Sequence, residues 1–117
     1  MSKIAFDIDD TLYKVRIRKV DGRDIGDQVP DYDLIQVLRW FYNNEDEIFV
    51  WSGGSIDYAQ TIVDKLGLTS MVTVIPKVEL YDKSNSQNID IAFDDEETRL
   101  AKVDIKVKRP NYNDISA

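Results

Sequence analysis

The stretch FDIDDTLY, residues Phe6 to Tyr13, places three carboxylates within four positions. Asp7, Asp9 and Asp10 directly follow an apolar run at 4–6, which is typical of a buried strand. Carboxylates at the end of a buried strand cost free energy unless a cation or hydrogen bonds compensate them. The stretch therefore predicts a strand that brings acidic side chains to a site where a cation binds.

Length and composition narrow the chemistry that this site can use. A chain of 117 residues with 43% hydrophobic and 32% charged residues predicts one globular domain spanning 1–117. No apolar run approaches the roughly 20 residues of a membrane span, and the opening Met-Ser-Lys is not typical of a signal peptide, so we expect a cytoplasmic protein without a membrane partner. The chain has no cysteine and no histidine, so catalysis would have to use carboxylates, hydroxyls, lysines and a hard metal ion.

The charge is uneven along the chain. The net charge of −7 argues against a protein that coats nucleic acid. Two segments are nevertheless basic: residues 14–23 contain five basic side chains and one acidic, and residues 102–109 contain four and one. These segments are candidate places to hold a phosphate-bearing substrate.

Strand and helix patterns alternate along the chain. We expect strands at 3–8, 47–52, 71–76, 89–93 and 104–108, the last at an edge, and helices at 31–44, 55–67 and 96–102. Asp21-Gly22 predicts the turn of a hairpin at about 14–29. The order predicts an α/β fold: a Rossmann-like three-layer sandwich with a central, mainly parallel five-stranded sheet covered on both faces, and a short β-hairpin flap. The aromatic residues Trp40, Phe41, Tyr42 and Trp51 are expected mostly in the core.

The carboxyl ends of parallel strands meet at one edge of a sheet, where ligands bind. Polar side chains follow four of the expected strands there: Asp7 and Asp9, Ser52-Gly53-Gly54, Lys77, and Asp94-Asp95. On an extended chain Asp7 and Asp9 would point the same way, about 6.6 Å apart. Mg²⁺ suits such a group, because it binds through one or two carboxylates and keeps other positions for water and phosphate.

Two of these strand ends could bind phosphate. Ser52 and the backbone N–H of Gly53 offer a cradle, although a simple glycine turn before a helix explains them equally well. Lys77 could neutralise a phosphoryl oxygen, and Lys83 is its competitor in the same loop.

These segments resemble the motifs of haloacid dehalogenase superfamily phosphatases, over about residues 3–100. The first motif of that family, a buried strand followed by DxDxT, is matched by FDIDDTLY, and the fourth, in its acidic-pair form, by IDIAFDDEE. The second, a strand ending in Ser or Thr, is matched by IFVWSGG, and the third, a lysine, more loosely by IPK. The first and fourth motifs are specific, whereas the second and third are not.

The resemblance implies a Mg²⁺-dependent phosphatase. Asp7 would be the nucleophile that forms an aspartyl-phosphate, and Asp9 would act as general acid and then as general base. Mg²⁺ would be held by Asp7, the Asp9 carbonyl and the acidic pair, with Asp95 favoured over Asp94 as the direct ligand. The remaining side chains expected to contact the substrate or its phosphoryl group are Ser52, Lys77, Thr11, Gly53, Lys14 and Arg16.

The flap at 14–29 is too short to be the cap domain of larger relatives, so the site should be open. An open site with a basic flap suggests a phosphorylated nucleotide or nucleic-acid end as substrate. A solubilising charged hairpin is the alternative explanation of the flap.

Two other functions compete with a phosphatase. A response-regulator receiver domain would need its acidic pair first and its phosphorylated Asp where Trp51-Ser52 stands, so the motif order excludes it. A catalytically weak module that binds Mg²⁺ and a phosphorylated partner remains the alternative, and the intact Asp7 and Asp9 favour turnover. Nothing in the sequence indicates the oligomeric state.

Overall fold

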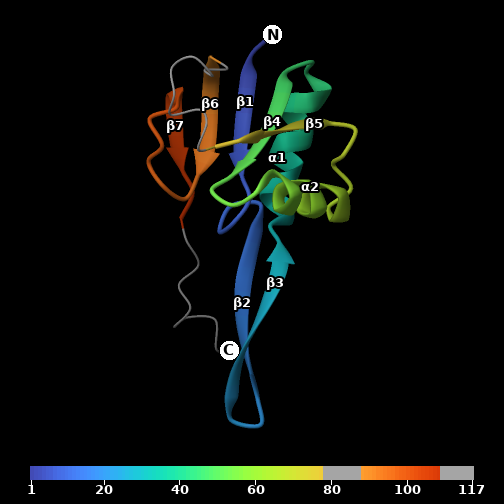
Figure 1. Cartoon of the computed structure of the whole chain (residues 1–117), viewed down its shortest axis with the longest axis vertical. Helices are drawn as coiled ribbons and strands as arrows, with labels where there is room; N and C mark the ends of the chain where they lie inside the picture. The colour runs from blue at the N-terminus through green and yellow to red at the C-terminus, as the bar shows by residue number, and fades with distance from the viewer. Residues whose placement is uncertain (78–87, 109–117) are drawn as a thin grey trace.

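The computed structural model describes residues 1–77 and 88–108. In these residues, a five-stranded parallel sheet has the order β5-β4-β1-β6-β7, and its strands are β1 (Lys3–Asp7), β4 (Glu47–Ser52), β5 (Val72–Pro76), β6 (Ile89–Asp94) and β7 (Ala101–Lys106). A separate antiparallel hairpin and two helices complete a small α/β sandwich: β2 (Tyr13–Val20), β3 (Arg23–Pro30), α1 (Tyr32–Asn43) and α2 (Ile56–Lys65) (Figure 1). The predicted fold class is thereby confirmed.

The central strand β1 is apolar on both faces because a buried cluster lies on each face of the sheet. It pairs with β4 through Lys3↔Glu47 to Asp7↔Trp51, and with β6 through Ile4↔Ile91 to Phe6↔Phe93. Its residues 4–6 are completely buried. Such continuous burial is what a strand in the middle of a parallel sheet requires.

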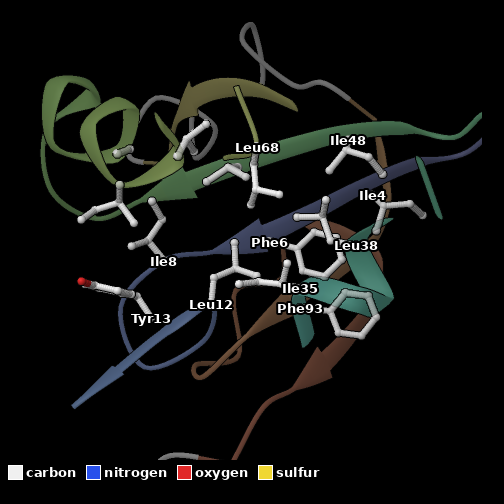
Figure 2. Close-up of a cluster of buried hydrophobic side chains, with 14 residues drawn as sticks. Ile4, Phe6, Ile8, Leu12, Tyr13, Ile35, Leu38, Ile48, Leu68 and Phe93 are labelled. Atoms are coloured by element: carbon white, nitrogen blue, oxygen red, sulfur yellow. The ribbon is translucent and has the colours of Figure 1, made fainter. Parts of the chain in front are cut away.

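Both described helices pack on the same face of the sheet (Figure 2). The buried side chains between this face and the helices form one cluster, called here the helix-side cluster. It joins alternate residues of β1 and β4 to the inner faces of the helices: Ile4, Phe6, Ile48, Val50, Ile35, Leu38, Ala59, Ile62 and Val63. Phe6 and Phe93 stack within it, with ring centroids 4.7 Å apart and planes 3° apart. These contacts attach α1 and α2 to β1 and β4.

Each helix begins one residue after its predicted first residue, because that residue is the N-cap. The Asp31 side chain accepts a hydrogen bond from the Leu34 N–H, and the Ser55 side chain accepts one from the Tyr58 N–H, so each caps the first turn of its helix. Gly67, just after α2, has a φ of +73°, which glycine adopts without strain.

The opposite face of the sheet is also buried, but no helix in the described residues packs there. Its cluster is formed by Ala5, Phe49, Trp51, Ile75, Ile89 and Ala92, with Leu100 and Ala101 against it. The predicted helix at 96–102 is wrong, because residues 95–100 lie outside regular structure and β7 begins at Ala101 rather than 104.

The short β6–β7 connection explains that error. Ile89 pairs with Ala101 and Asp94 with Lys106, so the chain must return along the whole of β6, about 16 Å at 3.3 Å per residue. A helix over 96–102 would span only about 10 Å at 1.5 Å per residue. Only an extended connection is long enough to return the chain to Ala101 beside Ile89. As predicted, β7 is an edge strand of the sheet.

The hairpin β2–β3 projects beyond the carboxyl ends of β1 and β6 (Figure 1). Its turn is Asp21-Gly22, with φ of 52° and 75°, as predicted. It extends the molecule to 50 Å in one direction, against 28 and 25 Å in the others. None of residues 14–29 belongs to either buried cluster.

The expectation that the aromatic residues are mostly core holds for Trp51, which is fully buried, and for Phe41, which packs against the helix-side cluster. It is wrong for Trp40 and Tyr42, which are 60% and 40% exposed. Trp40 lies two positions after the buried Leu38, about 200° around the helix axis, and therefore faces outward. No helix in the described ranges is long and apolar enough to cross a membrane.

Candidate active site

The strand order places the carboxyl ends of β1 and β6 at a topological switch point. From β1 the chain continues to β4 and β5 on one side, and it then crosses to β6 and β7 on the other. In open α/β sheets, ligands bind where the order reverses in this way. Asp7 is the last residue of β1 and Asp94 the last of β6, so the two acidic motifs meet at this point.

Strand alternation puts three charged side chains on one side of this edge. Asp7 follows Ala5 by two residues, Asp94 follows Ala92 and Lys77 follows Ile75, and all three apolar residues belong to the cluster opposite the helices. The Lys77 Nζ lies 2.7 Å from Asp94 Oδ2 and 4.0 Å from Asp7 Oδ1.

Asp94 is the most heavily hydrogen-bonded of these carboxylates. Its Oδ2 accepts from the Trp51 indole Nε1 at 3.1 Å and pairs with Lys77, and its Oδ1 accepts from the Glu96 backbone N–H at 2.9 Å. It is 1% exposed, so these donors replace the water that a buried carboxylate loses. Through its hydrogen bond with Trp51, Asp94 connects the buried cluster opposite the helices to the site.

Asp95 completes a group of three buried carboxylates. Asp7, Asp94 and Asp95 each offer an oxygen within 4.8 Å of the others. Asp95 also lines a cavity of about 200 Å³, whose other lining residues are Asp7, Asp9, Asp10, Gly53, Lys77 and Glu96, whereas Asp94 does not line it. This difference supports Asp95 as the more accessible ligand for a hard cation.

The pKa values show that ionising these carboxylates together is unfavourable without a bound cation. Burial, and then the charge of Asp94, raise the pKa of Asp7 to about 8 against the opposing charge of Lys77. Burial also raises the pKa of Asp94. Burial alone would lower the pKa of Lys77, but its hydrogen bond to Asp94 and the charge of Asp7 raise it, so this lysine stays charged. A divalent cation would relieve the repulsion that remains.

The chain turns sharply after Asp7. Strand β1 ends at Asp7 rather than at the predicted residue 8, and Ile8 is buried in the helix-side cluster. Asp10 has a φ of 59°, and its N–H donates to the Tyr13 carbonyl. The expectation that the chain stays extended from Asp7 to Asp9 is therefore wrong, although both residues line the same cavity.

The side chains of this turn have different surroundings. Thr11 is fully buried, and its hydroxyl donates to Asp7 Oδ2 at 3.4 Å. Asp9 is exposed, and its Oδ1 accepts a hydrogen bond from the Tyr58 hydroxyl at 2.6 Å. The two candidate catalytic carboxylates are thus held by different groups.

The strand end at Ser52 lies beside the cavity. Ser52 is buried, and its hydroxyl accepts a hydrogen bond from the Gly54 N–H at 3.0 Å. Gly53 is exposed and lines the cavity. Of the two elements of the expected phosphate cradle, Gly53 thus lines the cavity and Ser52 does not, and the Ser52–Gly54 hydrogen bond is also what a simple glycine turn would form.

Not every predicted contact residue is at this cavity. Lys14 and Arg16 line a separate pocket of about 550 Å³ at the base of the hairpin, and Lys14 forms a 2.8 Å ion pair with Asp31. The competing Lys83 lies outside the described residues. Lys108, from the basic segment 102–109, lines a third pocket of about 690 Å³, which also includes Asp95.

Tyr58 and the indole of Trp51 are the site groups that the sequence analysis missed. A buried indole N–H usually needs an acceptor, so a tryptophan next to the Ser52 strand end was a usable signal. Tyr58 lies in the first turn of the helix that follows Ser52-Gly53-Gly54, and such a turn starts at the ligand-binding edge. Its pairing with Asp9 depends on the tertiary fold and had no sequence signal.

Comparisons of the chain with protein-family models, with curated proteins and with solved structures returned no match.

Proposed function

We propose that this protein is a Mg²⁺-dependent phosphatase that hydrolyses a phosphomonoester through an aspartyl-phosphate on Asp7. The observation that carries the proposal is the group of buried carboxylates at the switch point. Asp7 lies there with Lys77 and Asp95, and Asp9 lines the same cavity. One carboxylate for attack, a second for proton transfer and a lysine for phosphoryl charge are what such a reaction needs in a chain without histidine.

The donor atoms fit Mg²⁺. The side chains of Asp7, Asp94 and Asp95 are all carboxylates, which hard cations prefer. A bound cation would also offset the cost of ionising Asp7, whose pKa is raised by burial. Asp7, Asp95 and the Asp9 carbonyl would hold the ion, with Asp94 in support. Bound Mg²⁺ would supply positive charge to the transferring phosphoryl group.

The residues of the chain would act in two steps. An Asp7 oxygen forms a bond to phosphorus while the bond from phosphorus to the ester oxygen breaks, and Asp9 gives its proton to that leaving oxygen. Asp9 then takes a proton from water as the water oxygen attacks phosphorus, the Asp7–phosphorus bond breaks, and inorganic phosphate leaves. Lys77 and the Ser52–Gly53 turn would bind the phosphoryl oxygens in both steps.

The proposed substrate is a phosphorylated nucleotide or nucleic-acid end in the cytoplasm. The pocket beside Asp95 gives it limited support, because Lys106 and Lys108 line that pocket together with the carboxylates of Asp95, Glu96 and Glu97. The hairpin gives less support than its composition suggests, since Lys14 is paired with Asp31 and Arg18 with Asp27.

Hydrolysis of p-nitrophenyl phosphate tests the proposal. We expect turnover that requires Mg²⁺, stops in EDTA and is lost in Asp7→Asn, while the matched variant Asp24→Asn in the exposed hairpin keeps full activity. Turnover that survives in Asp7→Asn would contradict the nucleophile. A folded protein that binds Mg²⁺ but turns over neither this ester nor 3′-phosphorylated oligonucleotides would favour the binding module.

A further inference from the structure

The candidate general acid Asp9 is less constrained than its neighbours. Asp7 is surrounded by buried groups, but the Asp9 side chain is exposed and lies after the end of β1. The backbone around it is fixed by a bridge between Asp9 and Tyr13 and by the left-handed Asp10. An exposed carboxylate on a fixed backbone can still rotate about its side-chain bonds, so proton transfer requires something to hold it.

Tyr58 makes the contact that can hold Asp9. Its hydroxyl donates a hydrogen bond to Asp9 Oδ1 at 2.6 Å. Its backbone N–H donates to the Ser55 side chain in the first turn of α2, and its ring packs against the helix-side cluster. The phenol is therefore fixed at its backbone, at its ring and at its hydroxyl.

The two carboxylates are approached from opposite sides of the sheet. Lys77 and Asp94 extend the face opposite the helices and surround Asp7, whereas Tyr58 comes from α2 on the helix face. Tyr58 thus engages Asp9 on the side away from the cluster around Asp7. With Oδ1 held by Tyr58, the other oxygen of Asp9 remains for the proton that the proposed reaction transfers.

Tyr58 also forms a hydrogen bond with the Gln28 side chain. Gln28 belongs to β3, so the same hydroxyl also links the hairpin to the site.

We propose that Tyr58 is a positioning residue, which holds the Asp9 carboxylate in the orientation that delivers a proton to the leaving oxygen of the substrate. This inference rests on the proposed phosphatase function and adds a role for α2 that the motifs do not contain.

The test compares two esters in wild type, Tyr58→Phe and the control Tyr42→Phe, a 40% exposed tyrosine of α1. The leaving group of p-nitrophenyl phosphate departs with little protonation, whereas the alkoxide of glycerol 2-phosphate needs a proton. We measure kcat/KM, which reports the steps up to formation of the aspartyl-phosphate. Loss of positioning should lower kcat/KM of Tyr58→Phe at least about tenfold for the alkyl ester, which is part of the rate enhancement that a general acid usually supplies. For the aryl ester kcat/KM should fall no more than about threefold.

The outcomes separate this inference from the proposed function. A selective loss with the alkyl ester, a melting temperature close to that of wild type and an unaffected Tyr42→Phe would support positioning. Equal losses with both esters, or no loss, would overturn the role of Tyr58 and leave the phosphatase intact. Absence of wild-type turnover with both esters and with 3′-phosphorylated oligonucleotides would overturn the proposed function, and this inference with it.

Discussion

Among the described residues, Lys77 is the cation that pairs with the carboxylates at the ends of β1 and β6. It lies 2.7 Å from Asp94 and 4.0 Å from Asp7, and all three side chains are less than one tenth exposed. Buried charges of this kind are tolerated only when they are paired. Removing one partner leaves the other charge buried without compensation, which destabilises the folded state. The residues that the sequence marks for chemistry are thus also residues on which the fold depends.

Lys77→Met should be strongly destabilising. It leaves the Asp94 carboxylate buried without its cation, which typically costs about 3–5 kcal/mol of unfolding free energy. Urea unfolding measures the loss. The control Lys102→Met removes a pair with Asp90 in which the lysine is 74% exposed, and it should change stability by less than about 1 kcal/mol. Equal effects of the two substitutions would contradict the buried-pair interpretation.

Asp7 makes metal-free stability depend on pH. Its pKa is raised to about 8 in the fold, so between about pH 4 and pH 8 the folded state holds a proton that the unfolded state has released. The free energy of unfolding should therefore fall as pH rises through this window. Asp7→Asn carries no charge at this position, and in EDTA at pH 8 it should be more stable than wild type by more than about 1.4 kcal/mol, the equivalent of one pKa unit.

Added Mg²⁺ provides the complementary measurement. It should stabilise wild type by about 2.7 kcal/mol at one hundred times its dissociation constant, and Asp7→Asn much less. Thermal unfolding at several pH values, with EDTA and with Mg²⁺, checks both parts. A wild type whose metal-free stability rises from pH 5 to pH 8 would show that Asp7 is ionised in the fold.

At the scale of elements, Asp31 connects the hairpin to the first helix. Its side chain caps α1 by accepting from the Leu34 N–H, it pairs with Lys14 of β2, and its own N–H donates to the Leu12 carbonyl. Burial would raise the pKa of Asp31, but the Lys14 and Leu34 hydrogen bonds outweigh it and lower the pKa. One residue therefore fixes where the flap ends and where the helix begins.

Asp31→Ala should cost about 1–2 kcal/mol, because it removes both the cap and the ion pair. Asp31→Asn retains a capping oxygen and should cost less. The cost of both substitutions relative to wild type should shrink at low pH, where Asp31 is protonated and the stabilisation by its depressed pKa is lost, whereas the difference between the two variants should persist because neither titrates at this position. Denaturant titrations at neutral and acidic pH provide the measurement, and identical costs for the two substitutions would contradict a capping role.

At the scale of the whole molecule, the hairpin is an appendage to an independent core. Its strands are paired along their whole length, from Tyr13↔Pro30 to Val20↔Arg23, but residues 14–29 add nothing to the two buried clusters. An isolated two-stranded hairpin contributes little stability of its own. The sheet and its helices should therefore fold without it.

Replacement of residues 15–28 by Asn-Gly tests this independence. Lys14 pairs with Val29, so a two-residue turn can join them directly. The shortened chain should unfold cooperatively at nearly the wild-type denaturant midpoint, with a slightly lower m-value because less surface becomes exposed. A chain that fails to fold, although Asp31 and the base of the hairpin are retained, would show that the flap is part of the folding unit.

The sequence by itself determined the parallel sheet, the hairpin turn, both helix starts and the motif residues at four strand ends. These features follow from local periodicity, caps and turn residues, which act over a few neighbours. Strand order and register then decided what the local pattern could not: that Asp7 and Asp94 end side by side, that Asp9 leaves the strand, and that the β6–β7 connection is too short for a helix.

The tertiary structure alone also decided the partners of the charged residues. Lys14 and Arg18 pair with nearby acids, Trp51 donates to Asp94, and Tyr58 reaches Asp9 across 49 positions of the chain. Such contacts depend on where separate elements pack in space, and no periodicity in the sequence encodes them. Acidic residues after a buried strand thus indicate a site, but only the packing of β1, β6 and α2 decides which groups hold each carboxylate.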